Sequence, residues 1–412
     1  MTEAAGHERE ASNIMRSIER AKAVISPEDS EIRAPCRARH PQGLGPERER
    51  DREHPFVIGI VRGEGIGPEV VDAGLAVLDA LSSTGTVTFE RRCAHPTREG
   101  GNGEHGSAID GTFRRFCEDV FTDHGVLFAG AVGGRFVYDM RIAFDLYHKI
   151  NPIATNASLR DVGCLKPDRV DGVDLVVVRE CVGGIYQGRW HTDRADDTQR
   201  VAAQSFSYDE SQVRRVVRIA AEMARDRRRR LLLVTKPNGI PDISRLWLDC
   251  ARDAAQEHDV ELTTLEIDYA VYRLIDAAPD LDVVVTSNLF GDILVDLGGL
   301  LLGSRGLCYG ASYSADGAAV YQTNHGAAHD LAGTDLANPG GQILSLAMML
   351  RVSFGLHDEA DLVDSAIDDV WRAGFRTPDI MQEGCVAVGT REMTDRICSR
   401  IVELAATTAS PC

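Results

Sequence analysis

The sequence lacks the features that mark membrane, secreted and zinc-stabilised proteins. No apolar run approaches the roughly 20 residues of a membrane span, and no signal-peptide segment follows the N-terminus. The ten cysteines include no Cys-x-x-Cys pair and no even framework, which argues against structural zinc and favours a reducing compartment. These absences predict a cytoplasmic protein that has no membrane partner.

The sequence is also poor in positive charge relative to negative charge. Its formal net charge is −18, which argues against a nucleic acid as the main partner because phosphate binding needs an excess of Lys and Arg. A local Arg or Lys cluster, or a metal ion, can still attract an anionic substrate into a cleft. With 412 residues, of which 43% are hydrophobic, the chain has the material for two compact domains.

Strands and helices are predicted to alternate from Phe56 onward. Residues 1–54 are rich in Glu, Arg, Pro and Ser, so we expect a disordered N-terminal extension there. The alternation beyond it predicts an α/β fold with a largely parallel sheet. Four arginines at the end of one predicted helix are interpreted as a solvated helix end. The clearest predicted strands are 56–61, 174–180, 231–235, 261–267 and 283–286, and the clearest predicted helices are 208–227 and 244–258.

A glycine loop joins the first strand to the first helix. Gly63, Gly65 and Gly67 stand between them, but this spacing is not the Gly-x-Gly-x-x-Gly of a dinucleotide-binding turn. Pro68 stands where the helix begins, which suits the first helical turn. A weak nucleotide fingerprint and a tight strand-to-helix turn are both open at this point.

The segment from Thr286 to Gly306 has the apolar density of a buried helix, yet it contains two acids. Asp292 and Asp296 are four residues apart and so share one helix face. Like charges on an apolar helix repel each other unless a cation lies between them, and a hard divalent cation prefers carboxylate oxygens. The alternative is an exposed acidic face on a surface helix.

Four motifs in this order resemble the β-decarboxylating dehydrogenases of isocitrate and 3-isopropylmalate, over essentially all of residues 56–400. They are GEGIGPEV at 63–70, VVVRECVGGIYQG at 176–188, TSNLFGDILVDLGG at 286–299 and NHGAAHDLAGTDLANPGGQILSLAMMLR at 324–351. The resemblance implies a two-domain fold that is not a Rossmann fold. Residues 55–146 plus 303–412 would form a large, cofactor-binding domain, and 147–302 a small domain with the dimer interface and the catalytic residues.

The resemblance also implies a metal site shared between two subunits of a homodimer. Asp268, Asp292 and Asp296 match three aspartates that bind Mg²⁺ or Mn²⁺, and the first of them comes from the partner subunit. Lys236, also from the partner, matches the lysine that assists deprotonation of the substrate hydroxyl, and we expect a lowered pKa for it. Tyr186 matches the tyrosine that protonates the enol after decarboxylation.

For the substrate, the resemblance implies that Arg141 and Arg179 hold a carboxylate, as arginine forks do. Asn151 stands where the family has a further arginine, so either another cation compensates or the substrate differs there. The loop that sets side-group specificity contains Arg135, Val137 and Tyr138, which match neither the isocitrate nor the isopropylmalate pattern. Arg135 either receives an anionic side group or points to solvent.

For the cofactor, the resemblance implies that the loop 325–338 holds adenosine. Asp330 would bind the ribose hydroxyls and repel a 2′-phosphate, which favours NAD over NADP. The residues implied in cofactor binding are His325, Gly326, Ala327, Asp330, Leu331 and Asn338 in this loop, with Asn238 and Asn288 near the nicotinamide and the metal.

The resulting expectation is metal-dependent, NAD-linked oxidative decarboxylation of a substituted malate, an isopropylmalate- or isocitrate-like 2-hydroxy acid. Two alternatives remain. One is oxidation of a tartrate-like acid without decarboxylation. The other is a catalytically silent regulatory subunit, whose signature would be loss of the lysine, the tyrosine or the metal-binding acids, all of which are present here.

Overall fold

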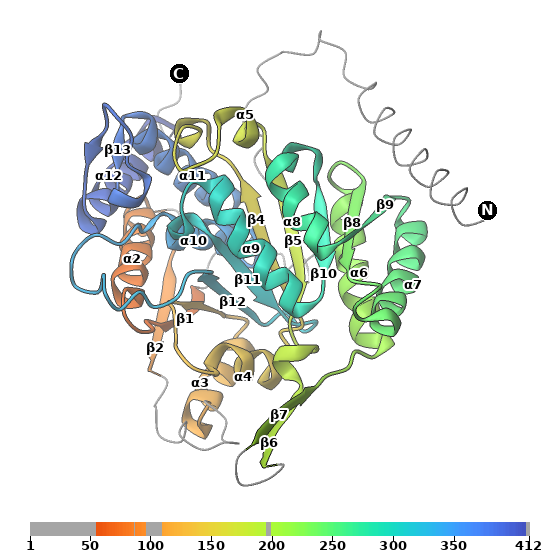
Figure 1. Ribbon diagram of the computed structural model, residues 1–412. Helices are drawn as coiled ribbons and strands as arrows, with labels where there is room; N and C mark the ends of the chain where they lie inside the picture. The colour runs from red at the N-terminus through yellow and green to blue at the C-terminus, as the bar shows by residue number, and fades with distance from the viewer. Residues whose placement is uncertain (1–54, 86, 96–108, 195–198, 409–412) are drawn as a thin grey trace, which may run out of the picture. The chain divides into compact units, whose positions relative to one another are not determined.

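A ten-stranded sheet is the framework of the folded chain (Figure 1). A computed structural model describes residues 55–85, 87–95, 109–194 and 199–408, so the predicted N-terminal extension lies outside the described residues. Along the sheet the strands are β2 (Phe89–Ala94), β1 (Phe56–Val61), β3 (Val126–Ala129), β12 (Ala319–Thr323), β11 (Tyr309–Tyr313), β4 (His148–Ala154), β5 (Asp174–Glu180), β10 (Val283–Thr286), β8 (Arg230–Thr235) and β9 (Glu261–Glu266).

The sheet is parallel at both ends and antiparallel in its middle. β2, β1, β3 and β12 pair in parallel, as do β5, β10, β8 and β9. The three antiparallel pairings join β12 to β11, β11 to β4 and β4 to β5. The predicted α/β fold with a largely parallel sheet is therefore confirmed, and the reversal places β4 between two antiparallel neighbours.

Helices pack against the sheet in separate groups. In Figure 1, α8 and α9 lie in front of β5 and β10, whereas α2, α10, α11 and α12 gather beside β1 and β12. The helices are α2 (Gly67–Ser83), α3 (Gly111–Thr122), α4 (Phe136–Ala143), α5 (Pro167–Val170), α6 (Glu210–Arg225), α7 (Pro241–His258), α8 (Ile267–Asp276), α9 (Asn288–Leu302), α10 (Gly340–Val352), α11 (His357–Arg372) and α12 (Thr390–Thr408). Short 3-10 turns are η1 (Ala157–Leu159), η2 (Ile185–Gln187), η3 (Ala278–Asp280), η4 (Arg305–Leu307) and η5 (Pro378–Ile380).

Two small two-stranded sheets complete the described fold. One is a hairpin of β6 (Arg189–Arg194) and β7 (Arg200–Ser205), which is exposed along nearly its whole length and extends away from the main sheet (Figure 1). The other joins β13 (Phe375–Arg376) to β14 (Val386–Ala387) in parallel. Strands of both predicted domains belong to the one main sheet, where β11 of the first pairs with β4 of the second. The predicted two-domain division at residues 146–147 and 302–303 therefore stays a prediction.

The core is built from the apolar strand centres and the inward faces of the helices. Val176, Val177 and Val178 of β5 are all buried, as the continuous apolar run predicts for a strand covered on both faces. In the arginine run after α6, Arg228, Arg229 and Arg230 are exposed, as a solvated helix end predicts, but Arg227 is not. Arg227 is almost fully buried and pairs with Asp174 at 2.9 Å and Asp282 at 2.8 Å, so it ties this helix end to the sheet.

Candidate active site

A cavity of about 320 Å³ lies among β4, β5, α9 and two loops. Eight of its lining side chains are charged or amide-bearing, and most of the others are glycine, alanine or valine. This mixture suits a small polar ligand held by a few fixed groups. The lining residues are Gly130, Ala131, Val132, Gly133, Gly134, Val137, Tyr138, Arg141, Lys149, Asn151, Arg179, Asp292, Val295, Asp296, Gln322, Thr323, Asn324, His325, Gly326 and Ala327.

Asp292, one turn into α9, is one of the two acids that line this cavity. Arg179 of β5 forms a short ion pair with its carboxylate, and the Tyr186 hydroxyl donates to its Oδ2 at 2.9 Å. Burial favours the neutral acid, but Arg179, the Tyr186 hydroxyl and Arg141 outweigh it and hold the pKa of Asp292 below its usual range. Asp292 is therefore a carboxylate at neutral pH. Burial and the neighbouring Asp292 raise the pKa of Tyr186, so its hydroxyl stays protonated.

Arg179 is held in place by α9 as well as by its own strand. Its Nε and terminal nitrogen donate to Asn288 Oδ1 at 3.1 and 2.8 Å, and Asn288 Nδ2 donates to the Gly183 carbonyl. A Cβ at Gly291 would lie 2.8 Å from Arg179 Cβ, so the close approach of helix and strand requires glycine there. The guanidinium is thus fixed before any ligand binds.

Asp296 lies one turn beyond Asp292, as the helical spacing predicts, but it is more exposed. It pairs with Arg305 at 3.0 Å and also lines the cavity. α9 is not buried all round, since Ile293 is 46% and Leu300 42% exposed. Among the described residues, no group of three His, Cys, Asp or Glu side chains is placed to hold a metal. Two carboxylates on one helix face supply the hard oxygen donors that Mg²⁺ or Mn²⁺ prefers, and a further donor has to come from elsewhere.

Lys236 and Asp268 lie together, apart from the residues that line the cavity. Lys236 follows β8, and its Nζ donates to Asp268 Oδ1 at 2.7 Å and to Glu266 Oε2 at 2.6 Å. The expectation of a lowered pKa for Lys236 is wrong for the single chain, because the hydrogen bonds to Asp268 and Glu266 raise it. Asn238 belongs to the same group, with its amide 3.5 Å from Glu266.

Two basic side chains, Arg141 of α4 and Lys149 of β4, form the buried wall of the cavity. Arg141 is 3% and Lys149 4% exposed. Burial, reinforced by Arg141 and Arg179, lowers the pKa of Lys149 to about 7. Lys149 Nζ donates to Asn324 Oδ1 at 2.5 Å, and Asn151 Nδ2 donates to the same oxygen at 3.0 Å. Asn151, which replaces the family arginine, thus lines the cavity as an amide.

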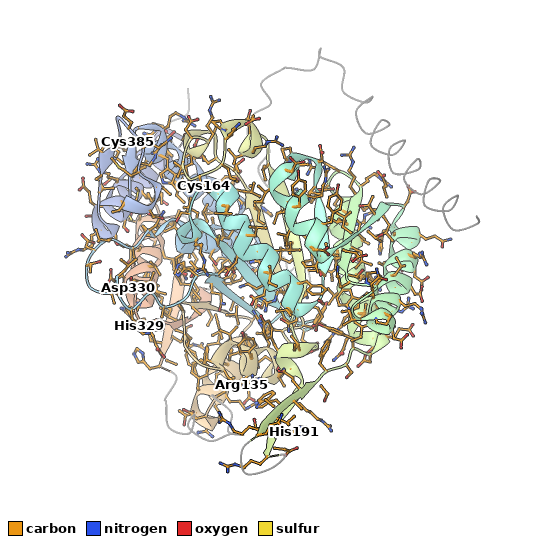
Figure 2. All side chains as sticks on the ribbon, in the orientation of Figure 1. Arg135, Cys164, His191, His329, Asp330 and Cys385 are labelled. Atoms are coloured by element: carbon orange, nitrogen blue, oxygen red, sulfur yellow. The ribbon has the colours of Figure 1, made fainter. Side chains whose placement is uncertain are left out.

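The specificity loop is divided by the structure. Val137 and Tyr138 line the cavity, whereas Arg135 does not. The Arg135 guanidinium lies over the Tyr138 ring at 5.3 Å and the Trp190 ring of β6 at 4.7 Å, so it neither faces the cavity nor points freely into solvent. Figure 2 shows Arg135 close to the hairpin that carries His191.

The proposed cofactor loop forms another wall of the cavity at His325, Gly326 and Ala327. The glycine loop after β1 fastens it, because the Ile66 amide donates to the Ala327 carbonyl at 2.8 Å. Gly65, at φ +59°, would bring a Cβ within 1.9 Å of that carbonyl oxygen. The glycines thus serve a tight turn and a close backbone approach, which is the second of the two interpretations left open above.

The remaining cofactor residues lie at different depths. Asp330 is exposed beyond the cavity rim, and Figure 2 places it beside His329 on the outer loop. Leu331 packs near Ile66 and Val70. Asn338 is buried at the start of α10, where its Oδ1 accepts from the Gly340 amide at 2.8 Å. Asn288 is fully buried and holds Arg179 as described above.

Sequence reasoning missed Lys149, Asn324 and Glu266 as parts of these clusters. Lys149 and Asn151 are two positions apart on one strand and so face the same way, a signal that was available once a strand is placed there. Asn324 begins the motif at 324–351, and Glu266 stands two residues before Asp268. Neither position carries a pattern that distinguishes it from a surface polar residue.

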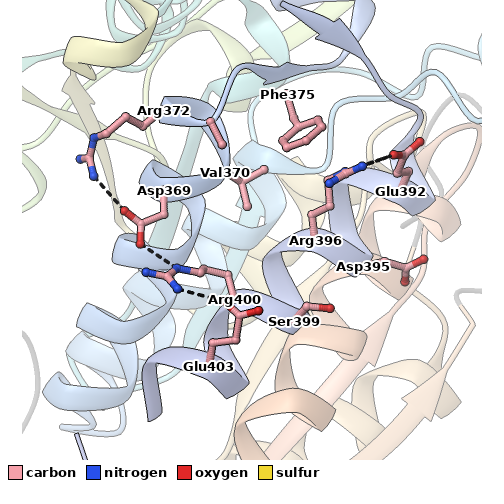
Figure 3. A pocket seen from close by; sticks show the side chains of 11 residues that line it. Asp369, Val370, Arg372, Phe375, Glu392, Asp395, Arg396, Ser399, Arg400 and Glu403 are labelled. Atoms are coloured by element: carbon pink, nitrogen blue, oxygen red, sulfur yellow. Dashed lines mark hydrogen bonds and ion pairs between the residues drawn. The ribbon is translucent and has the colours of Figure 1, made fainter. Parts of the chain in front are cut away.

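A larger surface hollow of about 790 Å³ lies between α11 and α12, distant in sequence from these clusters (Figure 3). Its arginines are already paired with acids of the same hollow. Arg400 binds Asp369 at 2.8 Å, and Arg396 binds Glu392 at 2.6 Å while lying over the Phe375 ring. The hollow therefore offers no unpaired arginine to an anionic ligand, unlike the smaller cavity with Arg141 and Lys149.

The fold and the carboxylate–tyrosine–arginine cluster define a dehydrogenase class, and comparison with known proteins supports this. The sequence model of the isocitrate/isopropylmalate dehydrogenase family matches residues 57–397. The chain belongs to this family. It is therefore an oxidoreductase, and its family consists of dehydrogenases that decarboxylate hydroxy acids.

Individual relatives agree over nearly their full lengths. The 3-isopropylmalate dehydrogenase of Aquifex aeolicus (strain VF5) is 37% identical over 366 residues, which cover 85% of this chain and 98% of that protein. That of Nitratidesulfovibrio vulgaris is 38% identical over 363 residues, covering 84% and 99%. The crystal structure of isocitrate dehydrogenase from Methylococcus capsulatus superposes with a TM-score of 0.74 at 29% identity, covering 84% of this chain and 99% of that one. No helix of the described residues has both the length and the apolar character needed to cross a bilayer.

Proposed function

We propose that this protein catalyses the NAD-linked, divalent-metal-dependent oxidative decarboxylation of a substituted malate. The observation that carries the proposal is the Asp292 cluster. A carboxylate, a protonated tyrosine hydroxyl and a fixed guanidinium meet at one polar cavity, with buried Arg141 beside them. A malate-type substrate requires these groups, since it presents a hydroxyl between anionic groups.

Asp292 and Asp296 would hold Mg²⁺ or Mn²⁺ together with Asp268 of the partner subunit. The donor set fits, because each acid supplies hard oxygens and the first two already share a helix face at the cavity. A metal held there would supply Lewis-acid polarisation of the substrate's oxygen, and bound NAD would supply the hydride acceptor.

The chain's own residues supply the binding and the proton transfers. Arg141 and Arg179 hold a substrate carboxylate. Tyr186, whose raised pKa keeps it protonated, gives its proton to the enol carbon after CO₂ leaves. Lys236 of the partner subunit takes the hydroxyl proton. In the single chain its pKa is raised, so this role requires a change of surroundings when the shared site assembles.

NAD rather than NADP is the proposed cofactor. Asp330 stands exposed on the loop whose start lines the cavity, where its carboxylate can accept hydrogen bonds from ribose hydroxyls. The same negative charge would repel a 2′-phosphate.

A homodimer is proposed because α8 and α9 leave an apolar surface exposed. Tyr269 and Tyr272 of α8 are 51% and 59% exposed, and Ile293 and Leu300 of α9 are open as well. Large apolar side chains gathered on neighbouring helices mark an association surface. Lys236 directly follows the end of β8, and Asp268 lies at the start of α8. A partner packed on this surface can therefore receive both side chains in its own site.

The test is NADH formation by the purified protein with Mn²⁺ across isocitrate, 3-isopropylmalate, homoisocitrate, tartrate and malate, with CO₂ measured alongside. We expect turnover of at least one acid with one CO₂ released per NADH. NADH without CO₂ would instead support the tartrate-like alternative. Turnover of any acid by this partner-free preparation would exclude the regulatory-subunit alternative, and no turnover while NAD and Mn²⁺ still bind would mean that the substrate lies outside this panel.

A further inference from the structure

Strand β4 presents Lys149 and Asn151 to the same cavity. Side chains two positions apart on a strand point to the same face, and both of these line the cavity while being almost completely buried. Lys149 stands opposite Arg179 across the β4–β5 pairing and opposite Ser312 across the β4–β11 pairing. The basic group is therefore fixed in the middle of the sheet, at the closed side of the cavity.

Arg141, and Lys149 when it is protonated, place positive charge on this buried wall without a matching anion. Neither Lys149 nor Arg141 forms an ion pair with any carboxylate in the parts of the chain that the structure describes, and Arg141 Nε is buried without a hydrogen-bond partner there. Asp292, the lining carboxylate whose charge acts on both, is already engaged by Arg179 and Tyr186. Buried charges are costly unless paired, so this wall is complementary to an anion that the chain does not supply.

The Lys149 ammonium has donors left to bind such an anion. Its hydrogen bond to Asn324 Oδ1 uses one of three N–H groups. Asn324 Oδ1 also accepts from Asn151, and Asn324 Nδ2 donates to the Tyr309 carbonyl at 3.2 Å. These two hydrogen bonds fix the Asn324 side chain, which in turn positions the Lys149 ammonium. The hydrogen bond to Asn324 orients the other two N–H groups of Lys149, and no carboxylate of the described residues is hydrogen-bonded to them.

We propose that Lys149, together with Arg141, binds a carboxylate of the substrate and sets the enzyme's requirement for a dicarboxylic acid. This inference rests on the proposed function for the identity of the substrate class. It answers the open question at position 151, since the cation missing there is supplied two residues earlier on the same face. The lysine ammonium is a compact charge and lacks the planar, bidentate donor geometry of an arginine guanidinium. The site therefore recognises the charge of that carboxylate more than its orientation.

The test measures binding rather than turnover, so it is independent of whether an oxidisable acid is found. Malate, 2-hydroxybutyrate and 3-hydroxybutyrate are titrated calorimetrically into the full-length protein with Mn²⁺. Each hydroxybutyrate has a methyl group in place of one malate carboxylate. Lys149→Met should weaken malate binding by roughly 10- to 100-fold, the range for a lost hydrogen bond to a charged group. Binding of at least one hydroxybutyrate should stay within about twofold, because the carboxylate that Lys149 reads is already absent from it.

Two further variants separate charge recognition from structural support. Lys149→Arg keeps the charge and should retain malate binding to within a few-fold, whereas the exposed Lys166→Met is the matched control and should behave as wild type. Equal weakening of all three acids by Lys149→Met would show a structural role and overturn the proposal. Unchanged malate binding in that variant, or a wild-type protein that binds no malate, would also overturn it.

Discussion

At the scale of single residues, two adjacent basic residues of β4 face opposite sides of the sheet. Lys149 faces the polar cavity, whereas His148 faces the core, where its ring lies 4.4 Å from Tyr147 and 5.5 Å from Tyr313. Neither ring nitrogen of His148 has a hydrogen-bond partner among the described residues. Burial, together with Arg215, lowers the pKa of His148 to about 3, so the ring is neutral in the folded protein.

This arrangement makes His148 a source of acid sensitivity. As pH falls below about 6.5, the unfolded chain protonates His148 but the folded chain does not until about pH 3. The free energy of unfolding therefore decreases through this window, by at most about 1.4 kcal/mol per pH unit from this group. His148→Phe removes the contribution, so its stability relative to wild type should improve steadily between pH 6.5 and 4 in urea unfolding. A constant difference across that range would contradict the assignment.

The site residues predicted from motifs differ in how far the structure brings them together. Asp292, Arg179 and Arg141 line one cavity, and the Tyr186 hydroxyl donates to Asp292 there. Arg135 does not face the cavity, since its partner Trp190 lies on a hairpin whose position no local pattern reveals. The sequence alone does not show that Lys149 is buried, because its burial depends on which strands pair with β4.

At the scale of elements, the contact between α9 and β5 determines the position of Arg179. The helix comes close enough for its backbone at Gly291 to touch the arginine stem, and Asn288 one turn earlier accepts the guanidinium hydrogen bonds. A side chain at position 291 would have to displace Arg179 from both Asn288 and Asp292.

Gly291→Ala should therefore damage activity more than stability. Alanine is favoured over glycine in a helix by about 1 kcal/mol, which partly offsets the steric cost. A displaced guanidinium should lower kcat/KM by roughly 100-fold. Gly111→Ala, whose added Cβ would meet only Arg115 at 3.9 Å, is the matched control in steady-state kinetics and thermal unfolding. Kinetics equal to wild type in Gly291→Ala would show that this contact does not position Arg179.

Elements with continuous apolar character were predictable, and β4 was not. β5 and β10 occupy the predicted ranges, and α9 begins and ends within the predicted segment, closed by Gly303 at φ +86°. β4 reads HKINPIA, in which polar residues and a proline suggest a loop. Lys149 and Asn151 are tolerated in a central strand because both face the polar cavity, which periodicity alone does not reveal.

At the scale of the whole molecule, the single chain separates the proposed catalytic groups into two sets. Asp292, Asp296, Arg141 and Arg179 line the cavity, and Tyr186 donates to Asp292. Lys236 instead pairs with Asp268 in a separate cluster. The exposed apolar side chains of α8 and α9 offer the surface on which two copies can meet. The proposed site completed across that surface would account for two acids on one helix without a third among the described residues.

The measurement that tests this account most directly is complementation between Asp292→Asn and Lys236→Met. Each variant alone should form no NADH from the acid identified in the panel with Mn²⁺, because every site lacks either its metal acid or its base. Co-expressed with two different tags and purified as the mixed dimer, they should recover about half of the wild-type activity, since one of the two sites is then intact. Turnover by Asp292→Asn alone, or an inactive mixed dimer, would contradict the shared metal-dependent site.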